Sequence, residues 1–416
     1  MTKSNSSRIK RWLLQKIGDS VEDAPIRFLL ADGEGVSPST AEPVASVCIS
    51  DWQTLAGFVC NAEIAFGDGY ADGRIRVDGD LVCFLETVLR SRQDAKSAGF
   101  CSTLLSRWLQ RTQANTLRGS ARNIHHHYDL TADFYKLWLD PRLVYTCAYF
   151  PDPATPLDEA QLAKMDYVCR KLLLQPGEKV VDAGCGWGAL ALHMAKHYGV
   201  TVKAFNISNE QILFARERAK AEGLSHRVEF IEDDYRNIAG GFDAFVSVGM
   251  LEHVGAENYE KLGRVIHRTI GDSGRGLLHF IGRNQVRPFS PWIRKRIFPG
   301  AYVPVLRQVM DMFEPWDYSV LDIENLRHHY TRTLEHWLAR FEDSSDTVAK
   351  MFGSEFVRAW RLYLAGSMAA FRAGNLQLFQ VVFAGSECRQ VPWTRAGLYD
   401  AQLGAGKEPK WIHAMS

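Results

Sequence analysis

The apolar positions between residues 158 and 384 switch repeatedly between a strand-like and a helix-like period. Short β-branched apolar runs favour buried strands, whereas apolar residues spaced three and four apart favour helices. The first run that predicts a strand ends at Asp182. The others lie at 201–207, 228–231, 242–248 and 276–281. The patterns that predict helices lie at 158–173, 189–196, 209–222 and 257–269. This alternation predicts an α/β fold with a doubly wound parallel sheet and helices on both faces.

The pattern changes in residues 283–312, which are rich in prolines and aromatic residues. We expect such an insertion to cover a site or to touch a partner. Its cations are Arg287, Arg294, Lys295 and Arg296. Strands at 317–322 and 376–384 then predict an antiparallel edge, with helices at 325–341 and 357–372.

The first hundred residues predict a small α+β unit. The strands are expected at 27–33 and 44–49, the helices at 52–60 and 81–90, and a further helix at 103–111. The glycine-rich stretch 66–79 is typical of turns. Residues 1–17 predict an amphipathic helix whose apolar face carries Ile9, Trp12, Leu13 and Ile17. It could contact a membrane surface, but packing on its own domain is favoured.

Length and composition set the broad class. A chain of 416 residues suggests two domains, and we place them at 1–118 (N-terminal domain and linker) and 119–403 (C-terminal domain), with a loose tail at 404–416. The net charge of +1 gives no global field for nucleic acid. Eight scattered cysteines without a CxxC pair favour reduced thiols in the cytoplasm. No apolar run approaches the roughly 18 residues of a membrane span.

Polar and glycine residues gather at the predicted ends of strands. Gly184, Gly186 and Gly188 follow Asp182 in a GxGxG pattern, which fits the GxGxxG dinucleotide fingerprint poorly. Ligands of doubly wound sheets bind at the carboxyl ends of the strands. The other polar residues expected to converge there are Asn206, Asp234, Glu252 and His279. The run His125–His127 does not predict a metal site, because adjacent side chains point in different directions.

The motifs together resemble those of the cyclopropane-fatty-acyl-phospholipid synthases, and the mycolic acid cyclopropane synthases share the catalytic half. The matching strings run from about residue 123 to about residue 385. They are HYDL, YTCAYF, GCGWG, SNEQ, DYR, GMLEHVG, LLHFIG, PWIRKRIFPG and FRAGNLQLFQVVF. The resemblance implies a Rossmann-like S-adenosylmethionine (AdoMet) methyltransferase. It also implies methylene transfer from AdoMet to a cis double bond of a phospholipid acyl chain, which forms a cyclopropane ring.

The resemblance further implies a bound bicarbonate that acts as the base. Its pocket would consist of the side chains of Cys147, Glu252, His279 and Tyr330 and the backbone of Ile281. Structural roles are the alternatives. Glu252 could cap a helix that begins near Ala256, His279 could be a core histidine, and Cys147 a buried apolar group.

The AdoMet site implied by the resemblance is built on the glycine loop. The methionine part would lie against Gly184, Cys185, Gly186 and Gly188, with Asp182 holding the loop and Tyr145 and Thr146 closing over the cofactor. Asn206 stands where an acid or threonine is common, so Gln211 is the expected ribose partner. The residues expected around the adenine are Asp234, Tyr235 and Arg236. Phe280 stands where threonine is usual, which leaves the precise substrate open.

The expected partners are unsaturated phospholipid acyl chains at the inner membrane surface, reached by a cytoplasmic, peripherally bound enzyme. A homodimer is expected by resemblance, and no nucleic acid. Three other functions stay open. They are methyl or methylene addition to a lipid without ring closure, lipid binding without turnover, and methylation of a small molecule.

Overall fold

The computed structural model describes residues 3–21, 23–94 and 130–399. They belong to two compact units. The first takes Met1–Gln113, Val286–Pro299 and Tyr330–Leu376, and the second takes Ala114–Gln285, Gly300–His329 and Gln377–Ser416. The domain division at residues 118 and 403 falls outside the described residues and stays a prediction. The predicted helix at 103–111, the histidines 125–127 and the tail also lie outside them.

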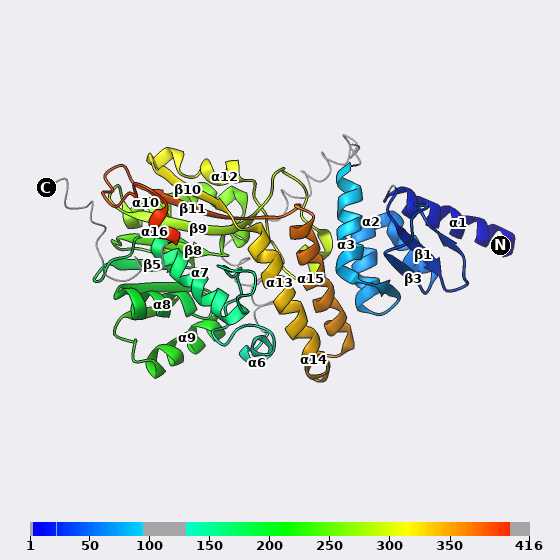
Figure 1. Ribbon diagram of the computed structural model, residues 1–416, viewed down its shortest axis with the longest axis horizontal. Helices are drawn as coiled ribbons and strands as arrows, with labels where there is room; N and C mark the ends of the chain where they lie inside the picture. The colour runs from blue at the N-terminus through cyan, green and yellow to red at the C-terminus, as the bar shows by residue number, and fades with distance from the viewer. Residues whose placement is uncertain (1–2, 22, 95–129, 400–416) are drawn as a thin grey trace. The chain divides into compact units, whose positions relative to one another are not determined.

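The second unit is built on a seven-stranded sheet with the order β10-β11-β9-β8-β5-β6-β7 (Figure 1). Its strands are β5 (Lys179–Ala183), β6 (Thr201–Asn206), β7 (Val228–Glu232), β8 (Ala244–Val248), β9 (Arg275–Gly282), β10 (Ser319–Asn325) and β11 (Gln377–Ala384). Strands β5 to β9 pair in parallel, whereas β11 pairs antiparallel with both β9 and β10. The predicted parallel sheet with an antiparallel edge is confirmed.

Helices cover both faces of this sheet. One face packs against α7 (Leu157–Lys171), α8 (Ala189–Tyr198) and α9 (Asn209–Ala221), and the other against α10 (Tyr259–Ile270). The remaining short helices of this unit are α6 (Ala132–Lys136), η1 (Tyr235–Asn237), η2 (Leu251–His253), η3 (Ala256–Asn258), α12 (Leu306–Met310), η4 (Glu314–Trp316) and α16 (Ala396–Tyr399). The sheet is therefore doubly wound, as its sequence pattern predicts.

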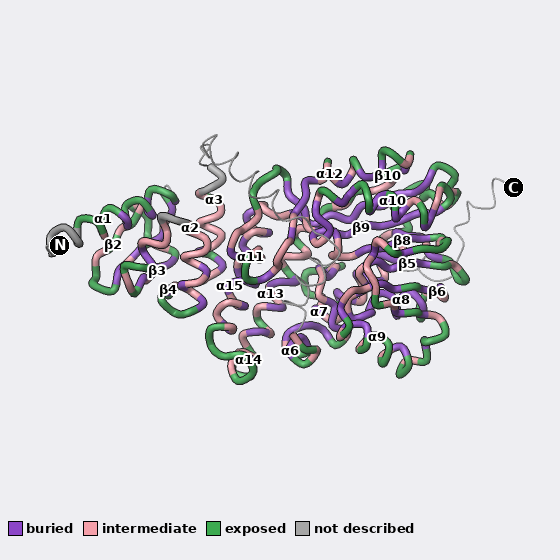
Figure 2. The backbone as a smooth tube through the Cα atoms, turned by 180° about the vertical axis from the view of Figure 1, so that it is seen from behind, coloured by how far each residue is buried: buried purple, intermediate pink, exposed green. Residues whose placement is uncertain are grey.

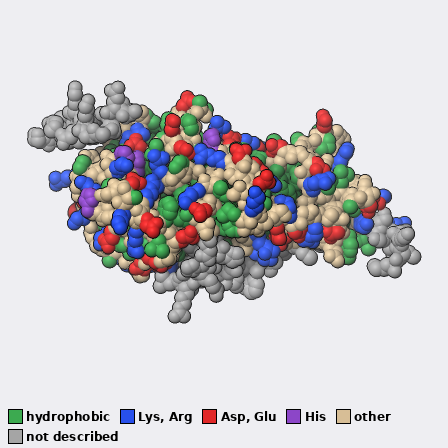
Figure 3. Space-filling view, turned by 90° about the horizontal axis from the view of Figure 1, so that it is seen from below, with side chains coloured by type: hydrophobic (Ala, Val, Ile, Leu, Met, Phe, Trp, Pro, Cys, Tyr) green, Lys and Arg blue, Asp and Glu red, His purple; other side chains and the backbone are tan. Residues whose placement is uncertain are grey.

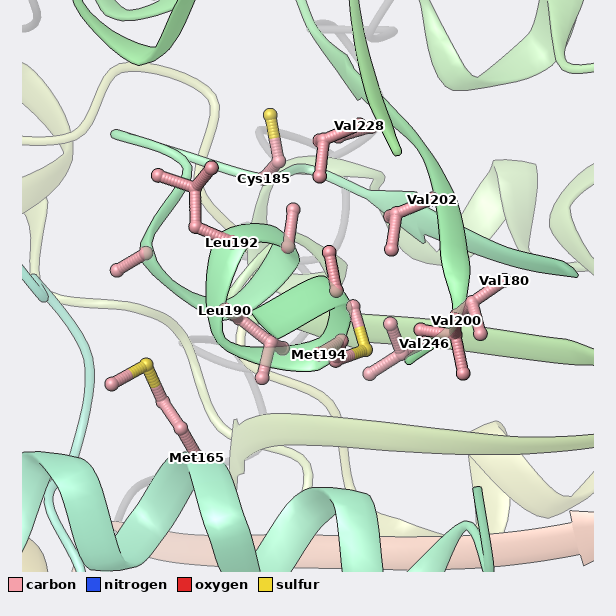
Figure 4. Packing of buried hydrophobic residues seen from close by; sticks show 14 of the residues in the cluster. Met165, Val180, Cys185, Leu190, Leu192, Met194, Val200, Val202, Val228 and Val246 are labelled. Carbon is pink, nitrogen blue, oxygen red and sulfur yellow. The ribbon is translucent and has the colours of Figure 1, made fainter. Parts of the chain in front are cut away.

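Alternation along the strands divides the core into two layers. In β5, Val180 packs with the layer under α7 and α8, whereas Val181 packs with the layer under α10. Figure 4 shows Met165 of α7 and Leu190 of α8 in the first layer. The central strands are buried along almost their whole length (Figure 2). Because Phe280 follows His279, its ring faces the second layer and contacts Phe379.

The first unit contains a four-stranded sheet with the order β2-β1-β3-β4 and helices around it. The strands are β1 (Ile26–Leu30), β2 (Gly35–Val36), β3 (Ala45–Ile49) and β4 (Ile75–Gly79). The helices are α1 (Lys3–Asp19), α2 (Trp52–Ala71), α3 (Leu81–Asp94), α11 (Pro291–Arg296), α14 (Ser345–Phe352) and α15 (Ser354–Arg372), and α13 (Arg327–Asp343) has residues in both units. The predicted small α+β unit is confirmed.

Helix α1 packs on its own unit. Leu13, Leu14 and Ile17 are buried in a core with residues of β1 and β3, while Ile9 and Trp12 are exposed. The packing role that the pattern favoured is thus confirmed for the inner face of the helix.

Residues 66–71 of the glycine-rich stretch are helical, so the turn expected at Gly67 and Gly69 is wrong, and the turn lies at Asp72 and Gly73. Both residues belong to α2, which continues to Ala71. A Cβ atom at Gly67 would lie 2.3 Å from Cδ1 of Trp292, and one at Gly69 would lie 2.8 Å from Cδ1 of Ile75. The glycines therefore allow close packing against the helix instead of a reversal of the chain.

Charges of both signs are interspersed over the face drawn in Figure 3. This distribution agrees with the net charge of +1. Among the described helices, none is both long enough and apolar enough to cross a bilayer.

Candidate active site

The loop between β5 and α8 depends on three glycines with positive φ. These φ values are +90° at Gly184, +54° at Gly186 and +84° at Gly188, a region that side chains disfavour. A Cβ atom at Gly184 would also lie 2.9 Å from Cβ of Met250. The N–H groups of Gly184 and Cys185 both donate to the carbonyl of Phe205, at 2.9 and 3.0 Å. The loop is thus held open at the carboxyl ends of β5 and β6.

A cavity opens at this loop and takes in most of the predicted cofactor residues. Those that line it are Tyr145, Thr146, Asp182, Gly184, Cys185, Gly186, Asn206, Gln211, Asp234 and Tyr235. Two predicted residues, Gly188 and Arg236, are not among the residues that line the cavity. Gly188 is the N-cap of α8, and the guanidinium of Arg236 pairs with Asp234 at 3.0 Å.

The segment that carries Tyr145, Thr146 and Cys147 is tied to the body of the unit by buried polar groups. The carboxylate of Asp140 accepts from the N–H of Val144 at 2.7 Å. From α7, Nε2 of Gln161 donates to the carbonyl of Thr146 at 2.9 Å, and Nζ of Lys164 donates to Oγ1 of Thr146 at 2.9 Å. The loop over the cavity is therefore fixed by hydrogen bonds from Asp140 and from helix α7.

Lys164 and Asp182 place two opposite charges in the cavity wall. Both are buried, at 2% exposure each. Burial lowers the pKa of Lys164 to about 8, although the charges of Asp140, Cys147 and Asp182 oppose this shift. Burial raises the pKa of Asp182 to about 7, and Lys164 opposes that shift. Within the described residues, Oδ2 of Asp182 has no hydrogen-bond partner, so it is available to a ligand.

The sugar end of the predicted site is polar and uncharged. Nδ2 of Asn206 donates to Oε1 of Gln211 at 2.6 Å and to the carbonyl of Gly186 at 3.3 Å. These bonds place both amide side chains at the end of β6, beside the glycine loop. Both amide side chains line the cavity, and the role of Gln211 as the ribose partner stays a prediction.

Aromatic rings form a continuous wall on the other side. The ring of Tyr145 lies 5.4 Å from that of Tyr135 and 5.3 Å from that of Trp138. Trp187, which lines the cavity, lies 5.7 Å from Tyr135. Such packing excludes water from one side of the site.

Glu252 is a buried carboxylate of η2, after β8, that contacts the end of β9. Its Oε1 accepts from the N–H of Ile281 at 2.6 Å, while Oε2 has no partner among the described residues. Burial raises the pKa of Glu252 to about 7. Gly255 is the N-cap of η3, so Glu252 is not the cap of the helix that begins at Ala256.

His279 lies on β9, two residues before Ile281, and is 2% exposed. Its Nδ1 lies 3.0 Å from Nε2 of Gln380 on β11. Burial holds the pKa of His279 well below its usual range, and the charges of Lys164 and Lys171 add to the shift. Its Nε2 is buried and has no partner in the described parts of the chain. The imidazole is therefore neutral, with one nitrogen left for a ligand.

The last two predicted anion ligands are less closely defined. Cys147 is fully buried, and its thiol donates to the carbonyl of Ala148 at 3.1 Å. Tyr330 belongs to the first unit, where its ring lies 4.6 Å from that of Phe371. Its place at the anion pocket stays a prediction.

Three polar residues of the site were missed by the sequence analysis, namely Lys164, His253 and Gln380. Lys164 and His253 line the cavity, and Gln380 contacts His279. His253 and Gln380 lie within the quoted strings GMLEHVG and FRAGNLQLFQVVF, which was the available signal. Across the described ranges, His, Cys, Asp and Glu side chains form no group of three that could hold a metal ion.

Comparisons with known proteins agree with this geometry. The family described as mycolic acid cyclopropane synthetase matches residues 115–381. A probable fatty acid methyltransferase of Pseudomonas putida is 33% identical over 90% of this chain and 96% of its own length. The cyclopropane-fatty-acyl-phospholipid synthase of Escherichia coli K12 is 42% identical over 62% of this chain and 66% of its own length.

Solved structures give the same result. The crystal structure of mycolic acid cyclopropane synthase CmaA1 complexed with SAH and CTAB matches with a TM-score of 0.60 and 30% identity. The match covers 63% of this chain and 97% of that one. Coclaurine N-methyltransferase, at 23% identity, shares the fold. The predicted methyltransferase fold and AdoMet dependence are confirmed, and the chain belongs to the mycolic acid cyclopropane synthetase family.

Proposed function

We propose that this enzyme converts a cis double bond of a phospholipid acyl chain into a cyclopropane ring, using AdoMet and a bound bicarbonate. The observation that carries the proposal is the pair of buried polar atoms without partners in the described structure, Oε2 of Glu252 and Nε2 of His279. Buried polar groups cost free energy unless they meet a partner. Their place at the end of β9, beside a methyltransferase cavity, suits a small ligand that takes part in the reaction.

The cavity wall fits AdoMet. Bound there, AdoMet would supply an electrophilic methyl group. The ammonium of Lys164 suits the carboxylate of the methionine part, and Oδ2 of Asp182 suits its amino group. Asn206 and Gln211 offer amide groups to the ribose hydroxyls. Both charges are buried, so their interaction with a zwitterionic ligand is stronger than it would be in water.

The two unpartnered atoms fit bicarbonate because they form an acceptor and donor pair. The Glu252 carboxylate can accept the hydroxyl hydrogen of bicarbonate, and an N–H at Nε2 of His279 can donate to its charged oxygen. Bicarbonate would supply a base for the proton that leaves before ring closure. Burial raises the pKa of Glu252, and a hydrogen bond from the bicarbonate hydroxyl would stabilise its carboxylate form against this shift.

A lipid substrate is supported by the relatives. Two of them are named for fatty-acyl substrates, and CmaA1 was crystallised with CTAB, an alkylammonium surfactant with one long chain. A protein related to this chain therefore binds a molecule with a long apolar chain. We extend this to an unsaturated phospholipid at the inner membrane surface.

Methylation without ring closure is a second candidate. It is favoured by the Pseudomonas putida relative, which aligns with 90% of this chain and is named a fatty acid methyltransferase. Both reactions use the same cavity. They differ in how the proton is lost after methyl transfer: ring closure gives a cyclopropane and consumes the double bond, whereas proton loss without ring closure gives a branched chain that keeps a double bond.

The test is to incubate the full chain with AdoMet, bicarbonate and vesicles of an unsaturated phospholipid, and to identify the product by mass spectrometry. A product that gains one CH2 and resists ozonolysis supports the proposal. A gain of CH2 with a cleavable alkene indicates methylenation. Incorporation of a methyl group without bicarbonate dependence would refute the assigned base, and absence of any lipid product would refute the substrate class.

A further inference from the structure

Gln380 and His279 face each other across the antiparallel pair of β11 and β9, where they are register partners. Gln380 is fully buried and His279 is 2% exposed. Nε2 of Gln380 lies 3.0 Å from Nδ1 of His279. A contact between two buried polar side chains on central strands has little freedom to rearrange.

This contact determines where the imidazole carries its proton. The amide nitrogen of glutamine only donates, so Nδ1 of His279 is the acceptor. In a neutral imidazole the other nitrogen then carries the hydrogen. Nε2 of His279 is the atom without a partner in the described structure, so its N–H is directed to a ligand.

We propose that Gln380 is a positioning residue that holds His279 in the Nε2–H tautomer, so that the histidine donates a hydrogen bond to the bound anion. This inference rests on the proposed function for the identity of the anion. Acceptors such as carboxylates and carbonyls often orient histidines and place the hydrogen on the nitrogen that faces them. A donor at this position has the opposite effect and leaves the hydrogen on the far nitrogen.

The charge of the side chain at position 380 affects His279 as well as its ability to donate a hydrogen bond. A glutamate at position 380 would accept from Nδ1–H and would stabilise a protonated imidazolium. A glutamine does not titrate, so it keeps the ring neutral. Lys164 and Lys171 act in the same direction by disfavouring a positive charge at His279.

The direct test is nitrogen NMR of the full chain with labelled histidine, because protonated and unprotonated ring nitrogens give well-separated signals. The signals of His279 are assigned by their loss in His279→Asn. We expect hydrogen only on Nε2 in the wild type, and hydrogen on Nδ1 in Gln380→Glu. Gln380→Met, which has similar volume and no donor, should lose the single tautomer. Hydrogen on Nδ1 in the wild type, or one unchanged tautomer in both variants, would overturn the proposal.

A matched control is available on the same strand. Gln377 is also buried, but its Oε1 accepts from Asn325 at 2.9 Å instead of contacting His279. Gln377→Glu therefore introduces a buried carboxylate into β11 away from the histidine. It should leave the His279 signals unchanged, and a shift as large as that in Gln380→Glu would show a general effect of buried charge and refute the specific one.

Kinetics provide the second readout. In buffer freed of carbon dioxide, Gln380→Met should need at least tenfold more bicarbonate for half-maximal turnover, with unchanged affinity for S-adenosylhomocysteine. An unchanged bicarbonate requirement would contradict the positioning role. If the wild-type enzyme does not respond to bicarbonate, the proposed function fails, while the NMR result still decides the tautomer.

Discussion

The buried carboxylate of Glu252 should make the stability of the protein depend on pH. Its pKa is raised from 4.5 to about 7, so the folded state holds a proton that the unfolded chain releases in this interval. Its stabilising contribution is therefore present below pH 4.5 and is lost as the pH rises through about 7. Each pKa unit corresponds to about 1.4 kcal/mol, which gives an upper limit of about 3 kcal/mol.

We expect Glu252→Gln to be more stable than the wild type at pH 8, by up to about 3 kcal/mol, and equally stable near pH 4.5. The amide oxygen keeps an acceptor for the N–H of Ile281, so the comparison isolates the charge. The free energies of unfolding in urea at the two pH values check this. A difference that does not change with pH would show that Glu252 is not desolvated as described.

Lys164 should contribute to the affinity for the cofactor. Its ammonium is the buried cation of the cavity wall, and hydrogen bonds to charged groups contribute roughly 1.5–3 kcal/mol. We expect Lys164→Met to weaken the binding of S-adenosylhomocysteine roughly ten- to hundredfold, measured by isothermal titration calorimetry.

The control is Lys171→Met on the same helix. Lys171 is also buried, but its ammonium lies 2.6 Å from Glu324 and 3.4 Å from Asp322, and it does not line the cavity. It should change stability and leave the affinity nearly unchanged. Equal affinities for S-adenosylhomocysteine in the two variants would show that Lys164 does not contribute to cofactor binding.

These residues also mark what the sequence could predict. Glu252 and His279 were predictable because they lie near the ends of predicted strands and in recognisable strings. Lys164 was not, because a lysine on an amphipathic helix is usually solvated. Its burial depends on Thr146, which lies in a loop 18 residues away. Gln380 was hidden in the same way, since its role depends on register pairing with β9.

At the level of single elements, alanine in the glycine loop should destabilise the protein through backbone strain and through steric overlap. Gly177, which precedes β5, separates the two effects. Gly188 has a φ of +84°, and a Cβ atom there would lie 2.7 Å from Cζ of Phe230. Gly177 has a φ of +90°, but its Cβ would have no described atom within 4 Å. An L-residue at positive φ costs about 1–2 kcal/mol, and overpacking adds about 1–3 kcal/mol.

We therefore expect Gly177→Ala to lower the free energy of unfolding only by the cost of the positive φ. Gly188→Ala should lower it by that cost and by the cost of overpacking against Phe230. Gly188→Ala should also weaken cofactor binding, because the turn into α8 must shift. Thermal unfolding together with calorimetry of S-adenosylhomocysteine binding checks both points. Equal losses of stability would show that contact with Phe230 is unimportant.

The close packing between α2 and α11 can be tested as a pair. The indole of Trp292 occupies the space above Gly67, and its Nε1 donates to Asp68 at 3.1 Å. Gly67→Ala should destabilise the protein by roughly 1–3 kcal/mol. The loss should be much smaller when Trp292→Leu is already present. Urea unfolding of the four proteins gives the coupling energy, and a coupling near zero would refute the contact.

Periodicity predicted most elements of the second unit well, since strands such as β5, β8, β9 and β11 are buried along most of their length. It failed at α2 because glycine has two physical uses, the tight turn and the close approach. Only tertiary neighbours distinguish them. Trp292 lies 225 positions from Gly67, so no local pattern could reveal that the stretch is helical. The sequence could not predict that residues 286–299 and 330–376 belong to the first unit, because this also depends on tertiary neighbours.

For the whole molecule, any attraction to an anionic membrane would have to come from local charge, since the net charge is +1. In the segment 286–299, Arg287 and Lys295 are exposed beside exposed Val286. Each cation near an anionic surface contributes about 1 kcal/mol. We expect Arg287→Glu together with Lys295→Glu to weaken binding to phosphatidylglycerol vesicles at least tenfold in co-sedimentation.

Arg296 provides the contrast for this experiment. Its guanidinium pairs with Asp68 at 2.8 Å, so Arg296→Ala should affect the stability of the first unit more than vesicle binding. If the double variant binds vesicles as the wild type does, the segment is not the membrane contact.

The order in which the chain is synthesised has a consequence for the first unit. Its sheet and helices α1 to α3 are made first, but α11 and α15, which pack on α2 and α3, follow only after residue 290. At a translation rate of about 5–20 residues per second, the apolar surface of α2 and α3 stays exposed for on the order of tens of seconds before α11 and α15 are synthesised. During that interval the nascent protein depends on chaperones, and truncated messages would yield an N-terminal fragment prone to aggregate.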